Sequence, residues 1–212
     1  MLREIYEKLL AYYGPQGWWP ADDEFEVMVG AILTQNTNWS NVEKAISNLK
    51  PGLEPFRLLE MDTRELAEKI KPSGFFNIKA VRLKEFLNWY QKYSFSPEKL
   101  KKEDLHKLRE ELLEIRGIGR ETADSILLYA LGKPVFVVDA YTRRMFGRLG
   151  VSLPDDYDDI RNYFETALNQ YSDRVDLYKE YHALIVRHSK VYCRKKPDCA
   201  NCFLQNTCKR QI

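Results

Sequence analysis

The sequence predicts an all-α protein, and three observations lead to that fold class. Apolar residues recur at i, i+3, i+4 and i+7 through most of the 212 residues, the spacing that lines one face of a helix. Polar residues suited to capping a helix precede two of these stretches, at Ser40 and Asp62. The one strand-like run, residues 135–138, is too short and isolated to found a sheet.

The predicted helices are marked by start signals and apolar stripes. Ser40 precedes Glu43 by three residues, the spacing of a capping box, and Asp62 precedes Glu65 in the same way. No linker separates the stripes, so any domain boundary is a packing boundary. In chain order the stripes are Val42, Ala45, Ile46 and Leu49; Leu66 and Ile70; Ala80, Leu83, Leu87 and Tyr90; Leu105, Leu108 and Leu112; Ala123, Ile126, Leu127 and Ala130; Ile160, Tyr163, Phe164, Ala167, Leu168 and Tyr171.

Composition excludes several classes of protein. No apolar run approaches the ~18 residues that span a membrane, and the first ten residues are charged and helix-like, so we expect a cytoplasmic protein. The formal net charge of +2 argues by itself against a nucleic-acid partner, but it averages two unlike segments. Residues 187–212 hold seven basic and one acidic side chain. Residues 151–186 hold three basic and eight acidic ones, interpreted as a solvated face that includes Asp155, Asp156, Asp158, Asp159 and Glu165.

A turn with two glycines, Gly117 and Gly119, joins two of the helical stripes. Glycines at this spacing let the backbone turn sharply and approach a ligand closely. The free N–H groups at the start of the second helix favour an anion, and Arg116 and Arg120 flank the turn. The turn is therefore a candidate phosphate-binding site, and the alternative is an ordinary helix–helix connection.

All four cysteines lie in the basic tail, at Cys193, Cys199, Cys202 and Cys208. Four thiols within sixteen residues of a chain without a secretion signal favour metal binding over two disulfides. Structural zinc usually takes two close pairs, whereas this segment has one close pair between two longer gaps. An all-cysteine site also suits a [4Fe-4S] cluster, and the spacing alone leaves both metals open.

Two further features suggest chemistry on a cationic or electron-poor group. Asp139 follows the apolar run and can cap the helix that starts at Ala140, but its carboxylate could also stabilise positive charge and activate water. Trp18, Trp19 and Pro20 form a run that one helix face cannot bury, and Trp39 lies nearby in the chain. Aromatic walls would suit a positively charged methylated purine, although core packing is the ordinary role of tryptophan.

The hairpin residues 115–123 resemble those of the helix-hairpin-helix DNA glycosylases of the endonuclease III superfamily. In that family the hairpin grips backbone phosphate, often with a monovalent cation on its carbonyls, and a V-D-[TA] segment about twenty residues further on carries the catalytic aspartate. Residues 138–140 match that segment, so the resemblance implies that Asp139 is catalytic. It also implies a base-excision enzyme acting on damaged double-stranded DNA, with Arg116, Gly117, Gly119 and Arg120 at the phosphate.

The cysteines resemble the C-x6-C-x2-C-x5-C segment that holds a [4Fe-4S] cluster in this family, with one residue fewer in the first gap. The resemblance therefore implies the cluster rather than zinc, with a structural role. It would order the tail and present five basic side chains to phosphates: Arg194, Lys195, Lys196, Lys209 and Arg210.

Two other segments resemble the family motifs that enter the DNA from opposite sides, Q-[AN]-T and G-[LF]-[YF]-N. They imply that Gln35 and Phe75 fill the gap left by the flipped base, although singly Gln35 could be a helix-end hydrogen bonder and Phe75 a core residue. Glu121 stands where bifunctional members carry the Schiff-base lysine, and a carboxylate cannot form an imine. This departure predicts a glycosylase without strand-cleaving lyase activity, unless Lys190 or Lys133 substitutes.

The tryptophan run resembles that of the 3-methyladenine DNA glycosylase III type, which implies a base pocket of Trp18, Trp19, Pro20 and Trp39. That type lacks the cluster, whereas this chain has the cysteines. We therefore expect a monomeric, nucleoid-associated glycosylase for alkylated purines, chiefly 3-methyladenine. Its two lobes would be residues 18–130, with the hairpin, and residues 1–17 plus 131–212, with the cluster, and the flipped base would enter between them. The alternatives are a glycosylase for oxidised pyrimidines or mismatched thymine, and a non-catalytic helix-hairpin-helix DNA-binding module.

Overall fold

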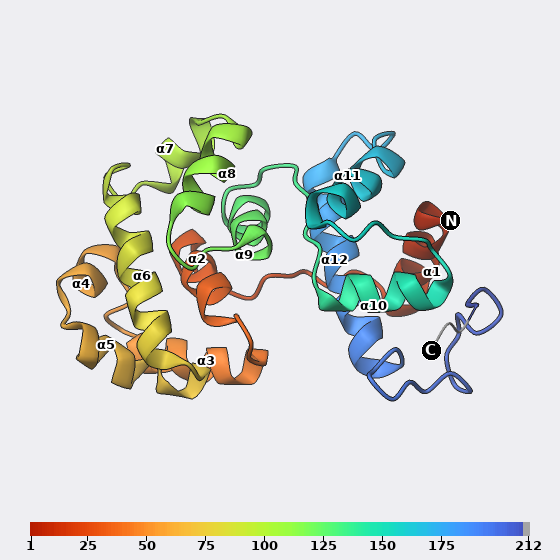
Figure 1. Cartoon of the computed structure of the whole chain (residues 1–212), viewed down its shortest axis with the longest axis horizontal. Helices are drawn as coiled ribbons and strands as arrows, with labels where there is room; N and C mark the ends of the chain where they lie inside the picture. Colours follow the sequence, from red (N-terminus) through yellow and green to blue (C-terminus); the bar gives the residue numbers. More distant parts are fainter. Residues whose placement is uncertain (210–212) are drawn as a thin grey trace. The chain divides into compact units, whose positions relative to one another are not determined.

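The computed structural model describes residues 1–209, and every regular element among them is a helix (Figure 1). The predicted all-α class is confirmed for this part of the chain. The chain divides into two compact units. One runs from Trp19 to Lys133, and the other joins Met1–Trp18 to the chain from Pro134 onward. No helix of the described residues is long and apolar enough to cross a membrane.

The unit from Trp19 to Lys133 is built around α2 (Glu24–Leu33), which is buried from Phe25 to its end. It packs against α3, α6 and a π-helical turn. The helices are α2 (Glu24–Leu33), α3 (Trp39–Leu49), α4 (Pro55–Glu60), α5 (Thr63–Lys69), a 3-10 turn (Lys71–Ser73), α6 (Phe76–Gln91), α7 (Pro97–Lys102), α8 (Leu105–Glu114), α9 (Arg120–Ser125) and the π-helical turn (Ile126–Ala130).

The second unit is built around α12 (Arg174–Val191), which packs against α1 (Leu2–Tyr13) and α10 (Ala140–Leu149). α11 (Tyr157–Ala167) adds Phe164, whose ring stacks on that of Phe136 at 4.5 Å. Phe136 belongs to the apolar run at residues 135–138, which is buried and extended but forms no strand. Of the stripe predicted on α11, Tyr163 and Ala167 are exposed, so that prediction was too wide.

The helix starts test the predicted caps one by one. Asp62 caps α5 as predicted, because its carboxylate accepts from the backbone N–H groups of Arg64 and Glu65. The capping box at Ser40 was wrong: α3 begins at Trp39, and Asn38 accepts from the N–H of Asn41 instead. Two residues that suit a cap stand two positions apart here, and spacing alone does not choose between them.

The C-terminal segment after α12 has no helix as far as residue 209 and lies on α1 and α10. The ammonium of Lys8 donates to the Thr207 hydroxyl at 2.9 Å, and the ring of Tyr12 stacks on Phe203 at 4.0 Å. Arg210, predicted to face phosphate, lies outside the described residues. This segment carries all four cysteines, so its docking on two helices gives the thiols a defined setting.

Candidate functional site

Asp139 is the N-cap of α10 and is almost fully buried. Its Oδ1 accepts from the Thr142 N–H at 2.7 Å and from the Thr142 hydroxyl at 2.9 Å. Its Oδ2 lies 3.4 Å from Nε2 of His182, on α12. The predicted cap is confirmed, and the second oxygen of the same carboxylate faces an imidazole that sequence reasoning did not single out.

Opposing effects set the pKa of Asp139. Burial raises the pKa most strongly of the single causes, and the contacts with His182 and Thr142 together lower it by more. The resulting pKa lies below the ordinary value for aspartate. Asp139 is therefore an anion at neutral pH although it is buried, which is the state needed to stabilise positive charge nearby.

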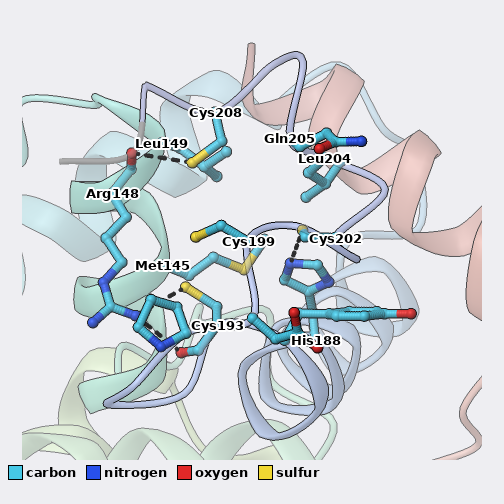
Figure 2. Close-up of a pocket in the computed structure, with 13 residues that line it drawn as sticks. Met145, Arg148, Leu149, His188, Cys193, Cys199, Cys202, Leu204, Gln205 and Cys208 are labelled. Carbon is cyan, nitrogen blue, oxygen red and sulfur yellow. Dashed lines mark hydrogen bonds between the residues drawn. The ribbon is translucent and has the colours of Figure 1, made fainter. Parts of the chain in front are cut away.

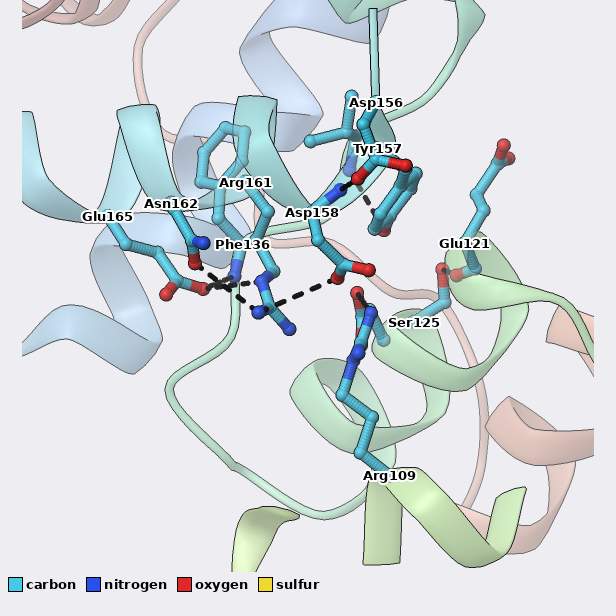
Figure 3. Close-up of polar contacts among 12 residues, drawn as sticks. Arg109, Glu121, Ser125, Phe136, Asp156, Tyr157, Asp158, Arg161, Asn162 and Glu165 are labelled. Atoms are coloured by element: carbon cyan, nitrogen blue, oxygen red, sulfur yellow. Dashed lines mark hydrogen bonds and ion pairs between the residues drawn. The ribbon is translucent and has the colours of Figure 1, made fainter. Parts of the chain in front are cut away.

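The extended run before Asp139 is held by α11 (Figure 3). The Phe136 N–H donates to the Glu165 carboxylate at 2.8 Å, and the Val138 N–H donates to the Tyr157 hydroxyl at 3.3 Å. Arg161 lies 3.8 Å from Glu165 and balances its charge. Interpreting Glu165 as part of a solvated face was therefore wrong, because it fixes the backbone that delivers Asp139.

The predicted base-pocket residues fall into two groups. In one compact unit the Trp18 ring lies 5.8 Å from the His182 ring, on the imidazole that faces Asp139. In the other unit Trp19 meets Trp39 edge to face at 5.2 Å and Tyr129 at 5.1 Å. Pro20 is exposed beside them.

Gly30 on α2 lies under the Trp19 and Trp39 rings. A Cβ at Gly30 would be 3.4 Å from Trp19 Nε1 and 3.6 Å from Trp39 Cη2, so the two indoles already pack closely on bare backbone. Tyr129 comes from the π-helical turn, an irregularity that often occurs at functional sites. The cluster therefore consists of Trp19, Trp39 and Tyr129 packed over Gly30. The sequence had pointed only to its tryptophans.

The hairpin turn between α8 and α9 has the backbone that its glycines suggested. Gly117 has φ +90°, in the left-handed region, and a Cβ there would collide with the Arg82 side chain. Gly119 is the N-cap of α9, and Arg116 and Arg120 on either side of it are exposed. The predicted phosphate-binding residues therefore share one exposed turn.

Gln35 lies half-buried against this hairpin. Its Nε2 donates to the Gly117 carbonyl at 3.0 Å and to the Thr122 hydroxyl at 2.9 Å. Its Oε1 accepts from the guanidinium of Arg82. Gln35 thus links the hairpin to α6, and an insertion into DNA would require it to leave these partners.

Phe75 differs from Gln35 in being exposed, with 65% of its surface accessible. It is the N-cap of α6 and has φ +46°, a left-handed conformation that is unfavourable for an aromatic residue. Asn36, next to Gln35, has φ +53°. Strained backbone at both predicted DNA-entering loops is the kind of feature that functional sites carry.

The four cysteines are free thiols, half-buried, and all line one pocket beside α10 and α12 (Figure 2). No group of three or more His, Cys, Asp or Glu among residues 1–209 is arranged to hold a single metal ion. The four predicted ligands therefore share one pocket, and their arrangement there does not identify a metal.

Basic side chains of α10 surround the cysteine loop. Arg144 donates to the Cys193 carbonyl at 2.8 Å, and Arg148 donates to the Arg194 carbonyl at 2.6 Å and approaches Cys193 Sγ at 3.5 Å. His188 Nε2 lies 3.5 Å from Cys202 Sγ. Sequence reasoning did not identify these two arginines as neighbours of the cysteines. Their i, i+4 spacing, which places them on one helix face, was the signal that could have found them. Positive charge and N–H donors beside the sulfurs suit thiolate ligands.

Glu121 stands in the first turn of α9 and is exposed (Figure 3). Its backbone carbonyl accepts from the Ser125 hydroxyl at 2.7 Å. One turn further on, Asp124 is fully buried and paired with Arg109 at 2.7 Å. The position that matches the family lysine is thus an acidic group at a helix start, where the dipole favours a negative charge.

Comparisons with known proteins agree with this fold. Residues 29–170 match the model of the HhH-GPD superfamily base excision DNA repair proteins. A Methanocaldococcus jannaschii protein named as a DNA repair glycosylase is 52% identical over 98% of this chain and 96% of its own length. The endonuclease III of Sulfolobus acidocaldarius is 30% identical over 87% of this chain and 81% of its own.

Among solved structures, the Helicobacter pylori 3-methyladenine DNA glycosylase bound to 1,N6-ethenoadenine is similar, with a TM-score of 0.77 and 36% identity. The likeness covers 89% of this chain and 97% of that one. The superfamily match spans the hairpin and Asp139, and the relatives match over nearly their whole lengths. The chain belongs to the HhH-GPD superfamily of base excision DNA repair proteins and is a DNA glycosylase.

Proposed function

We propose that this glycosylase flips alkylated purines, chiefly 3-methyladenine, out of duplex DNA and hydrolyses their N-glycosidic bond without cleaving the strand. The observation that carries the choice of substrate is the aromatic cluster of Trp19, Trp39 and Tyr129 over Gly30. A methylated purine carries positive charge and gains cation–π attraction from such faces, whereas a neutral base does not. Similarity to the Helicobacter pylori enzyme, at 36% identity, supports the same substrate class.

The proposed chemistry centres on Asp139. As the bond between C1′ and the base nitrogen breaks, its electron pair leaves with the base and positive charge grows on the sugar. The buried carboxylate stabilises that charge, and a water adds to C1′ while its proton passes to the same carboxylate. A base that is already cationic leaves as a neutral molecule, so the site needs little acid assistance for an alkylated purine.

The absence of lyase activity is proposed from the residues at the hairpin. Glu121 cannot form an imine with the sugar. The ammonium of Lys133, one possible substitute, is held by the backbone carbonyls of Lys101 at 2.8 Å and Glu103 at 2.6 Å. Lys190 is exposed in the last turn of α12 and remains the other substitute to test.

DNA binding is proposed at the hairpin and at the loops that carry Gln35 and Phe75. Arg116, Gly117, Gly119 and Arg120 would hold a phosphate, with a monovalent cation on the hairpin carbonyls. Phe75 and Gln35 would fill the gap left by the flipped base. The protein would bind double-stranded DNA as a monomer, which analytical ultracentrifugation can check.

A [4Fe-4S] cluster is proposed in the cysteine pocket as a structural group held by Cys193, Cys199, Cys202 and Cys208. Four free thiols on one pocket, with Arg148 and His188 beside two of the sulfurs, support a metal–thiolate site. The resemblance of the cysteine spacing to the family segment favours the cluster over zinc. When bound, the cluster would supply four metal–thiolate bonds to a segment with few apolar side chains. Arg194, Lys195 and Lys196 are exposed on that segment and would face phosphates.

A lesion panel tests the proposed function. Duplexes carrying 3-methyladenine, 1,N6-ethenoadenine, an oxidised pyrimidine or a thymine–guanine mismatch are incubated with the protein, and base release is measured separately from strand cleavage. We expect release of 3-methyladenine, with weaker release of the neutral 1,N6-ethenoadenine, and intact strands until alkali is added. Release confined to the pyrimidine substrates would favour the endonuclease III-like alternative, and borohydride trapping of a protein–DNA adduct would overturn the hydrolytic mechanism.

A further inference from the structure

Lys79 is a buried cation inside the unit that carries both DNA-entering loops. It lies on α6, and only 1% of its surface is accessible. Its ammonium donates to the Leu33 carbonyl at 2.8 Å and to the Ser73 carbonyl at 2.7 Å. A buried ammonium is costly unless it is hydrogen-bonded, so these two bonds explain how the fold tolerates it.

The two carbonyls occupy matching places in the chain. Leu33 is the last residue of α2, two residues before Gln35, and Ser73 ends the 3-10 turn, two residues before Phe75. Each carbonyl is at a helix end, where backbone acceptors lack partners within the helix. One ammonium therefore links the first residues of the two loops that are proposed to enter the duplex.

We propose that Lys79 is a positioning residue that sets the spacing of the Gln35 and Phe75 loops before DNA binds. The inference rests on the proposed function in one respect only, that these loops fill the gap in the base stack. Loops that are already placed lose less conformational entropy when they enter the DNA. Without the ammonium, the carbonyls of Leu33 and Ser73 would remain buried and unpaired. The position of each loop would then no longer depend on that of the other.

Burial lowers the pKa of Lys79 to about 8, with a smaller contribution from the charge of Arg82. Arg82 is also the residue that donates to Gln35. Both basic groups of this part of α6 therefore act on the same loop, one on its backbone and one on its amide side chain.

Lys84 provides a matched control on the same helix. Its ammonium donates to the carbonyls of Leu58 and Leu59, both at 2.7 Å, and to that of Met61, so it ties down the end of α4. Replacing either lysine with methionine removes a cation from backbone carbonyls. Of the two lysines, Lys79 alone binds backbone carbonyls beside the loops of Gln35 and Phe75.

The experiment measures loop insertion without requiring catalysis. The probe is a duplex with a tetrahydrofuran abasic analogue and 2-aminopurine beside it, whose fluorescence rises when its neighbour is unstacked. With Lys79→Met, we expect the unstacking rate to fall about tenfold, the loss expected when loop residues must be ordered during binding. Affinity for an undamaged duplex, measured by anisotropy, should change by less than about twofold, because phosphate contacts dominate it. Lys84→Met should change neither quantity.

Equal unstacking rates for the two variants would overturn the proposal. If Lys79→Met does not fold, as judged by circular dichroism, Lys79→Gln keeps an amide donor in the same cavity and is expected to show a smaller fall in the same rate. A Lys79→Gln rate equal to that of the wild type would then contradict the proposal. Failure of the wild type to release any alkylated purine in the lesion panel would refute the proposed substrate and leave this result standing.

Discussion

Oδ2 of Asp139 lies 3.4 Å from Nε2 of His182, although Oδ1 of the same carboxylate is engaged by Thr142. One oxygen therefore serves the start of α10, and the other faces an imidazole from α12. The helix cap and the proposed chemistry use different atoms of one side chain. This division lets Asp139 be held rigidly and still carry the charge that the reaction needs.

Replacing His182 tests whether the imidazole positions and tunes Asp139. Removing a partner that lowers the pKa of Asp139 should raise that pKa, so the acid limb of the pH–rate profile should move to higher pH. For His182→Leu we expect single-turnover base release at neutral pH to fall about tenfold, less than the roughly 10²–10⁴ that loss of the general base itself costs. His182→Gln, which keeps a donor, should recover part of the rate. An exposed histidine changed in the same way, His106→Gln, is the control, and an unshifted profile in His182→Leu would refute the role.

The buried ammonium of Lys79 gives a pH dependence of stability. Its folded pKa of about 8 lies below the ordinary lysine value of 10.5, so between these pH values the unfolded chain binds a proton that the folded chain does not. The free energy of unfolding should therefore rise with pH through this window, by roughly 3 kcal/mol relative to Lys79→Met. Urea denaturation of both proteins from pH 7 to pH 10.5 measures this difference. Parallel curves would show that the buried lysine does not titrate in that range.

Gly117→Ala tests the hairpin as a general phosphate site. Alanine at φ +90° is strained, and its Cβ would collide with Arg82, so we expect a loss of stability of about 1–3 kcal/mol. The displaced turn should also weaken binding to damaged and undamaged duplexes alike, because phosphates carry no sequence information. Gly132→Ala is the control, since Gly132 also has positive φ but has nothing within 4 Å of its Cβ position. Weaker binding to damaged DNA alone would contradict a phosphate role.

The cysteine pocket predicts a metal content that can be measured directly. Anaerobically purified protein should contain about four irons and show the broad visible absorption of an iron–sulfur cluster. Cys202→Ser should lose the colour and lower the melting temperature, since metal binding contributes to folding. Stoichiometric zinc with no visible absorption would show that the family resemblance had implied the wrong metal.

Much of the site could be predicted because its signals are local in the chain. Asp139 directly follows an apolar run and directly precedes a helix, and two glycines one residue apart define the hairpin. His182 could not be found in this way, because its partner Asp139 is in another helix and only folding brings them together. Glu165 was misread for the same reason, since its partner is the backbone of Phe136.

The buried position of Lys79 could have been predicted from the helical periodicity of the sequence. It stands four residues before Leu83 and eight before Leu87, on the buried stripe of α6. A lysine on an apolar stripe is usually excluded from the core, so its presence indicates specific partners. The cap at Asn38 shows the opposite limit, because Ser40 is an equally suitable residue and tertiary packing made the choice.

The most direct test of the account is single-turnover release of 3-methyladenine from duplex DNA by the wild type and by Asp139→Asn. Asparagine keeps the capping oxygen of α10 but removes the negative charge, so the fold and DNA affinity should be retained. We expect the rate to fall by about 10²–10⁴. If Asp139→Asn releases the base at the wild-type rate, the carboxylate is not the catalytic group and the proposed mechanism is wrong.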